Sequence, residues 1–207
     1  MSENKIKYHA LGPISHRVTR NADTLRENII ISPIGDFDSN LIRLVGQEVH
    51  RIFGYGTQLE PLIQHIDFAF DSSRNQHCST PIIGKLADMA PPQAIKILAI
   101  TRVDLFIPIL TYVYGEAQLG GKACIISIHR LNEGLGMGVW EPFSRRVVKE
   151  AIHELGHTFN LRHCQSHTCC MHYCRSIKDV DRKSGQLCRY CKILLGDEIK
   201  RLILATT

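Results

Sequence analysis

The sequence predicts an α/β protein in which short apolar strands alternate with amphipathic helices. Runs rich in β-branched residues occur at 28–33 and 94–101, and segments with helical periodicity lie between them. Because strands that alternate with helices usually form a sheet with crossover connections, we expect a sheet covered by helices. The composition, 44% apolar and 22% charged, is that of a globular chain.

The predicted scaffold begins with a strand and a helix. Residues 28–33 are apolar, β-branched and ended by a proline, as a buried strand is. The helix that follows has Asp38 or Ser39 as its N-terminal cap and stops at Gly54. Residues 65–70 then alternate polar and apolar side chains, which predicts a half-buried strand.

The chain continues with a second helix and with the strongest strand signal. We expect Thr80 to cap this helix, Pro81 to occupy its first position, and the helix to end near Ala90. Residues 94–101 are almost entirely apolar, so this strand is predicted to lie at the centre of the sheet. A short strand and a bend are expected over 104–114.

The next residues connect this scaffold to the C-terminal part of the chain. Glu116 is predicted to be a solvated loop carboxylate. Residues 123–129 form a strand, and if it lies at the sheet edge its free backbone groups could pair with an extended peptide. A helix is expected to begin near Ser144, a suitable cap, and a closing helix is expected over 192–205.

One stretch of the chain carries the spacing of a metal site. His153 and His157 lie four residues apart, so on a helix both imidazoles project from one face and can reach one ion. Glu154 lies beside them, about 100° round the helix, where it can act as a general base toward a metal-bound water. His163 follows ten residues after His153, so the chain must turn first, and Asn160 tolerates the left-handed conformation of such a turn. Three imidazoles and a water form an open tetrahedral zinc site, which is the catalytic pattern.

A second cluster of potential ligands follows directly. Cys188 and Cys191 form a C-x-x-C pair, and two upstream cysteines would complete a closed, structural Cys₄ zinc site. The residues alone leave four candidates for those two positions: Cys164, Cys169, Cys170 and Cys174. A redox-active dithiol is the alternative, but no thioredoxin-type βα unit precedes the pair.

Charge and hydropathy argue against several classes of protein. The net charge of +5 is scattered along the chain rather than grouped, so nucleic-acid binding is not expected. No apolar run is long enough for a membrane span, and the N-terminus lacks the apolar core of a secretory signal. We therefore expect a cytoplasmic protein in which the eight cysteines are metal ligands or free thiols rather than disulfides.

Together the two clusters resemble the archaemetzincins, a family of zinc-dependent metallopeptidases in the metzincin clan. The resemblance rests on the pattern His153-Glu-x-x-His157-x5-His163-Cys164-x4-Cys169-x-Met171, followed by Cys188-x-x-Cys191. Weaker similarity at 31–35, 74–76, 100–105 and 114–117 extends it over the chain from residue 29 to the end. Asn160 departs from the metzincin pattern, which has glycine at that position.

The resemblance implies a metzincin-like twisted mixed β-sheet over an active-site helix, within a single catalytic domain over 29–207. Residues 29–163 would form an upper lobe and 164–207 a small zinc-stapled C-terminal lobe, with 1–28 as an N-terminal extension. Two zinc ions per chain are implied. The catalytic ion would be held by His153, His157 and His163, and the structural ion by Cys164, Cys169, Cys188 and Cys191.

Two further residues belong to the same pattern. The resemblance implies that Met171 forms the Met-turn below the catalytic zinc. Tyr173 is placed as a tyrosine is in some metzincins, but we expect it not to take part in the reaction.

The sequence thus predicts a zinc metallopeptidase that hydrolyses peptide bonds in a peptide or small protein, with Glu154 assisting the attack of zinc-bound water. No motif fixes whether it is an endopeptidase or an aminopeptidase. The alternative is a zinc-stabilised interaction protein whose catalytic-looking site is blocked, with Cys170 or Cys174 filling the water position.

Overall fold

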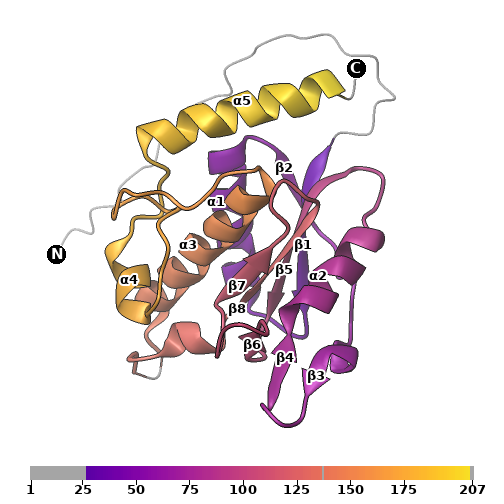
Figure 1. Ribbon diagram of the computed structural model, residues 1–207, viewed down its shortest axis with the longest axis vertical. Helices are drawn as coiled ribbons and strands as arrows, with labels where there is room; N and C mark the ends of the chain where they lie inside the picture. The colour runs from indigo at the N-terminus through magenta and orange to yellow at the C-terminus, as the bar shows by residue number, and fades with distance from the viewer. Residues whose placement is uncertain (1–26, 137, 206–207) are drawn as a thin grey trace, which may run out of the picture.

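A twisted five-stranded sheet forms the centre of the computed structural model, which describes residues 27–136 and 138–205 (Figure 1). Its strands lie in the order β2 (Gly56–Leu59), β1 (Asn28–Ile34), β5 (Ala94–Thr101), β8 (Ala123–Ser127) and β7 (Gly115–Ala117). The first four are parallel, and β7 is antiparallel to β8. A second, three-stranded sheet contains β3 (Phe70–Asp71), β4 (Gln76–Cys78) and β6 (Leu105–Phe106). The predicted mixed sheet is confirmed.

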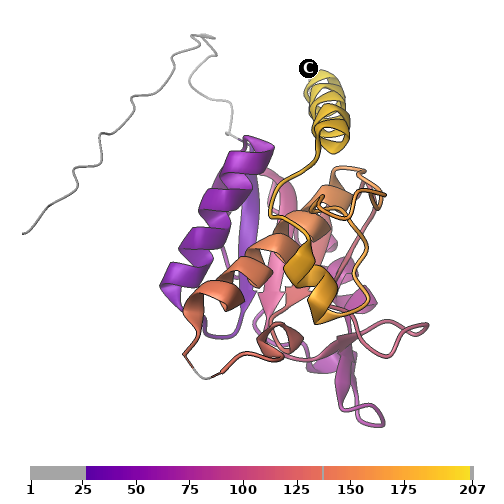
Figure 2. The ribbon, with the colours of Figure 1, turned by 90° about the vertical axis from the view of Figure 1, so that its left-hand side faces the viewer.

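Helices cover both faces of the larger sheet. α1 (Ser39–Phe53) and α3 (Trp140–Thr158) lie side by side on one face (Figure 2), and α2 (Ser79–Asp88) packs on the other. Alternate residues of β5 divide between the two cores: Leu98 and Ile100 pack with α1 and α3, whereas Ile97 and Ala99 pack with α2. Every residue of β5 is therefore buried, and its predicted central position is confirmed.

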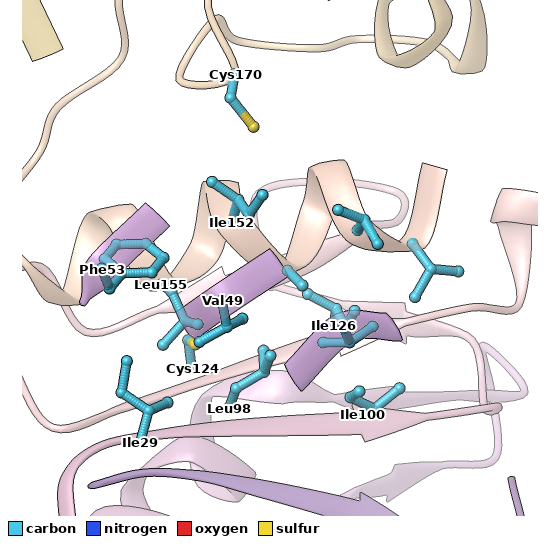
Figure 3. Packing of buried hydrophobic residues seen from close by; sticks show 14 of the residues in the cluster. Ile29, Val49, Phe53, Leu98, Ile100, Cys124, Ile126, Ile152, Leu155 and Cys170 are labelled. Atoms are coloured by element: carbon cyan, nitrogen blue, oxygen red, sulfur yellow. The ribbon is translucent and has the colours of Figure 1, made fainter. Parts of the chain in front are cut away.

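The core below α3 is built from branched aliphatic side chains. Figure 3 shows Leu98 and Ile126 of the sheet on the same side of α3 as Leu155, with Val49 of α1 beside them, whereas Ile152 lies on the side of α3 that faces Cys170. Because these side chains fix one face of α3 against the sheet, the opposite face of the helix is left for other contacts.

The first predicted helix is confirmed at both ends. The Asp38 carboxylate accepts a hydrogen bond of 2.7 Å from the backbone N–H of Asn40, which caps α1. Gly54 ends the helix in the left-handed conformation, with φ of 78°.

Two predictions in the first half of the chain are wrong. Residues 65–70 do not form a strand: a 3₁₀ turn occupies Asp67–Ala69, and only the short β3 follows. Ile63, Ile66 and Ala69 all enter the core beneath α2, and this three-residue spacing belongs to a turn rather than to a strand. The second helix begins at Ser79 with Cys78 as its cap, because the Thr80 hydroxyl donates instead to Glu116.

The condition set for peptide pairing by residues 123–129, a position at the sheet edge, is not met. β8 is flanked by β5 on one side and by β7 on the other, so β7 is the terminal strand.

Glu116 belongs to β7 and is not a solvated loop carboxylate. Its oxygens accept hydrogen bonds from Ser79 Oγ at 2.5 Å and from Thr80 Oγ1 at 3.0 Å, which tie β7 to the start of α2.

Helix boundaries in the second half also differ from those predicted. α3 begins at Trp140, and Ser144 is buried inside it, where its hydroxyl bonds the carbonyl of Glu141. The closing helix α5 (Arg189–Ala205) begins three residues earlier than expected, and α4 (Ile177–Arg182) and β2 were not predicted.

In the described part of the chain, no helix combines the length and apolarity that crossing a bilayer requires. The predicted extension 1–28 lies outside the described residues except for its last two, and the division at residue 164 stays a prediction.

A buried lysine joins the sheet to the end of α3. Lys96, on β5, is 3% exposed, and its ammonium donates to the carbonyls of Gly121 at 2.7 Å and Thr158 at 2.6 Å. It also lies 5.1 Å from the centre of the Phe159 ring. Burial lowers the pKa of Lys96 to about 8. Carbonyls at a helix C-terminus lack partners within the helix, so Lys96 supplies one for Thr158.

We predict that Lys96→Met lowers the free energy of unfolding by about 1–3 kcal/mol, because two buried carbonyls lose their donor. Denaturant unfolding of the full chain measures the change. Lys178→Met, on the exposed face of α4, is the control and should stay within about 0.5 kcal/mol of wild type. Equal stability of the two variants would contradict this role of Lys96.

Candidate functional site

Three histidines meet at the end of α3. His153 and His157 lie one turn apart on the helix, with their Nε2 atoms 3.2 Å apart. The ring centre of His163 lies 5.3 Å from that of His153 and 4.8 Å from that of His157. One nitrogen from each of the three rings lies within 4.8 Å of the others. The predicted set is therefore brought together.

Hydrogen bonds fix the tautomers of the two helical histidines. His153 Nδ1 lies 2.8 Å from the carbonyl oxygen of Cys170, and His157 Nδ1 lies 2.7 Å from that of Leu161. A carbonyl oxygen only accepts, so both Nδ1 atoms carry a proton and both Nε2 atoms present lone pairs. Two lone pairs that face each other at 3.2 Å repel unless a cation lies between them. The donor set thus fits zinc bound by imidazole nitrogens.

Burial differs among the three rings. His153 is 5% exposed and His157 is partly buried, whereas His163 is exposed. Burial lowers the pKa of all three imidazoles, that of His157 to about 4, so they are neutral at pH 7. Neutral imidazole is the form that binds metal.

The turn before His163 follows the sequence prediction. α3 ends at Thr158, and Asn160 adopts the left-handed conformation with φ of 60°. The backbone N–H groups of Asn160 and Gly120 both donate to the carbonyl of His157 at 2.9 Å, which closes the end of the helix. Asparagine therefore takes here the conformation that the metzincin pattern gives to glycine.

Glu154 is buried on the same helix, beside terminal strand β7. A methyl group at Gly115 would lie 2.6 Å from Glu154 Cγ and 2.6 Å from the carbonyl oxygen of Ile125, so only glycine leaves room for this carboxylate. Burial raises the pKa of Glu154 well above its ordinary value, and the nearby Glu150 carboxylate raises it further. Within the described residues, no protein group donates a hydrogen bond to Glu154, so its carboxylate can accept a proton from a substrate or a water.

Met171 packs directly against α3, the helix that carries His153 and His157. Its Sδ and Cε occupy the space next to Gly156, where a Cβ atom would lie 2.9 Å from Cε. Met171 is fully buried, and its carbonyl accepts from the N–H of Cys164 at 2.8 Å. The chain around Met171 therefore holds the segment after His163 close to α3. Tyr173 is exposed and contacts the His163 ring, with ring centres 5.0 Å apart.

Four cysteines form a second cluster at the start of α5. The sulfur atoms of Cys164, Cys169, Cys188 and Cys191 all lie within 4.8 Å of one another. The N–H of Cys188 donates to Cys169 Sγ at 3.3 Å, and that of Cys191 donates to Cys188 Sγ at 3.5 Å. The backbone bond from Cys191 and bonds to neighbouring sulfurs lower the pKa of Cys188 to about 7, which favours the thiolate that binds zinc.

Cys170 and Cys174 belong to neither cluster. The Cys170 thiol is buried and donates to the carbonyl of Lys149 at 3.2 Å, and the Cys174 thiol donates to the carbonyl of His172 at 3.5 Å. Neither sulfur fills a position among the three imidazoles, which removes the means of blocking that the sequence had suggested.

Sequence reasoning missed a buried ion pair beneath the histidines. Lys183 Nζ lies 2.8 Å from Glu150 on α3, and both side chains are almost fully buried. Burial opposes the charged form of Lys183, but the Glu150 carboxylate raises the pKa of this lysine above its ordinary value. Their separation of 33 positions in the sequence left no local signal.

Comparison with known proteins identifies the family. The model of Peptidase family M54 matches residues 25–197. The chain belongs to that family. Archaemetzincin of Methanocaldococcus jannaschii is 35% identical over 171 residues, which cover 82% of this chain and 93% of the relative. Archaemetzincin of Pyrococcus furiosus is 33% identical over 189 residues, 86% of this chain and 96% of the relative. The resemblance to the archaemetzincin zinc metallopeptidases is confirmed.

Solved structures agree with this assignment. The crystal structure of archaemetzincin from Methanopyrus kandleri matches with a TM-score of 0.78 and 28% identity, over 86% of this chain and 98% of that one. A zinc-dependent peptidase from Methanocorpusculum labreanum matches with a TM-score of 0.73 and 26% identity, over 81% and 99%. The metzincin-like fold class predicted for this metallopeptidase is therefore confirmed.

We predict that Gly115→Ala displaces the Glu154 side chain. With Glu154 in its predicted role of general base, the variant should hydrolyse peptides up to about 10²-fold more slowly, since a shift near 1 Å at a catalytic group costs that much. The overpacking should also lower the free energy of unfolding by about 1–3 kcal/mol. Peptide turnover and denaturant unfolding measure the two effects.

Gly84→Ala is the matched control. Gly84 lies in α2 with open space around it, so alanine there should raise stability by about 0.5–1 kcal/mol and leave turnover unchanged. Wild-type turnover in the Gly115 variant would show that this contact does not position Glu154.

Proposed function

We propose that this metallopeptidase hydrolyses peptide bonds with Glu154 as general base, and that His153, His157 and His163 hold the catalytic zinc. The observation that carries the proposal is that the Nε2 atoms of His153 and His157 face each other 3.2 Å apart. Beside them lies the buried carboxylate of Glu154, which accepts no hydrogen bond from a described residue. Zinc, when bound there, polarises a substrate carbonyl and makes water acidic enough to react near neutral pH.

The proposed reaction uses Glu154 twice. The carboxylate first accepts a proton from the attacking water and then delivers that proton to the leaving nitrogen. Burial of Glu154 supports the first step, because it raises the pKa of the carboxyl group and so favours uptake of a proton.

We infer that the substrate is a peptide or small protein, bound as an added strand. β7 ends the five-stranded sheet, and Gly115 of β7 lies against Glu154. An extended peptide that pairs with the outer edge of β7 would bring its backbone past this carboxylate. This proposal moves the peptide-binding edge from residues 123–129 to 115–117.

The second proposed ion is structural. Cys164, Cys169, Cys188 and Cys191 would bind it as four thiolates, which gives two zinc ions per chain. Because His163 and Cys164 are neighbours, this ion would hold the residue next to the third catalytic ligand. Thiolate ligands need reduced cysteines, which supports a cytoplasmic location.

Glu154→Gln tests the catalytic proposal. We expect the zinc-loaded variant to keep its metal and fold, but to cleave a peptide library about 10²–10⁴-fold more slowly than wild type, the usual contribution of a general base. Glu133→Gln, on an exposed loop, is the control and should cleave normally. Equal and negligible turnover by zinc-loaded wild type and the Glu154 variant would favour the alternative, a zinc-stabilised interaction protein.

Cys188→Ser tests the structural site. The variant should lose about one zinc per chain and melt at a lower temperature, because the bound metal contributes to folding. Elemental analysis and thermal unfolding are the measurements, and Cys78→Ser, outside the cluster, should change neither. Unchanged zinc content in the Cys188 variant would eliminate the second site.

A further inference from the structure

A third group of imidazoles lies on the loop between the two clusters. His167 Nδ1 lies 3.1 Å from His172 Nε2, and the two ring centres are 4.5 Å apart at near right angles. His167 is exposed to solvent and His172 is partly exposed. His167 lies in the four-residue spacer between Cys164 and Cys169, and His172 follows Met171.

Backbone contact orients one of these rings in the way that it orients the helical histidines. His172 Nδ1 lies 2.9 Å from the carbonyl oxygen of Cys164, so Nδ1 carries the proton and Nε2 presents a lone pair. That lone pair points at His167 Nδ1. The arrangement repeats that of His153, whose Nδ1 is held by the carbonyl of Cys170.

The separation of the two nitrogens suits a shared ion. Nitrogens bound to one metal at about 2.0–2.1 Å, with angles from octahedral to tetrahedral, lie about 2.9–3.4 Å apart. The observed 3.1 Å falls in this interval, as does the 3.2 Å between His153 and His157.

We propose that His167 and His172 form an exchangeable site for a divalent transition metal of the kind that imidazole prefers, such as zinc. Among the described residues, no third histidine, cysteine, aspartate or glutamate joins the pair, so water completes the coordination. Two protein ligands and an exposed position make this site weaker than the three-histidine and four-cysteine clusters, and it fills only when free zinc is supplied.

Such a site would act on the loop that joins the two clusters. Through its Nδ1–H, His172 holds the carbonyl of Cys164, and the N–H of Cys164 is held by Met171. An ion between His167 and His172 cross-links the spacer to the residue after Met171. A bound ion would therefore restrain the segment 164–172, which follows His163 and contains Cys164 and Cys169, without contacting Glu154.

Zinc uptake by the full-length holoprotein tests this site. After dialysis removes loosely bound metal, we expect equilibrium dialysis against micromolar zinc to add about one ion per chain to wild type. His167→Gln should abolish this extra uptake and keep the ions retained through dialysis. His65→Gln, at an exposed histidine elsewhere, should take up the extra ion normally.

Nitrogen NMR of the imidazoles separates the metal site from a simple hydrogen bond. Zinc should shift the signals of His167 Nδ1 and His172 Nε2 in wild type and leave that of His65 unchanged. No extra zinc uptake, equal uptake by the His167 variant, or uptake without these shifts would each overturn the proposal. None of these readouts requires peptide cleavage, so the site stands or falls independently of the proposed catalytic role of Glu154.

Discussion

The turn that ends α3 is the constraint on which both ligand clusters depend. Asn160 takes the left-handed conformation, the His157 carbonyl accepts from two N–H groups, and Lys96 donates to the last helical carbonyl, that of Thr158. His163 and Cys164 follow within four residues and are adjacent in the chain. A turn that brings the third imidazole to the other two therefore also delivers the first sulfur to its cluster, so the two sites share one geometric requirement.

Close packing, rather than hydrogen bonding, positions the Glu154 carboxylate. Gly115 lies against Glu154 on one side, and Met171 lies against Gly156 on the same helix. Both contacts need a residue without a side chain, because a Cβ atom at either position would overlap its neighbour. The carboxylate is thereby held in place while its oxygens stay free of protein partners, which suits a group that must receive and release a proton.

The parts of the molecule predicted from sequence are those with a local signature. Helical spacing alone placed His153, His157 and Glu154 on one turn, and the almost entirely apolar run of 94–101 placed β5 at the centre of the sheet. The left-handed residue was also identified, since few residue types other than glycine and asparagine adopt that conformation.

The remaining features depend on contacts between distant residues. β7 is three residues long and contains a charged side chain, so nothing marked it as the terminal strand that displaces β8 from the edge. The alternation over 65–70 predicted a strand, but the three-residue spacing of Ile63, Ile66 and Ala69 governed burial. Lys96 lies in an apolar strand, and its two acceptors are 25 and 62 residues away, which no local pattern announces.

The order of the elements along the chain has a consequence for biosynthesis. Every strand of the central sheet lies before residue 128, whereas every residue of the two ligand clusters lies after residue 152. A ribosome therefore releases the whole sheet before any ligand emerges, and domains generally fold from the N-terminus as they appear. The strands of the sheet are therefore made before the residues of either candidate metal cluster, and binding of metal by those residues would come late in the maturation of the chain.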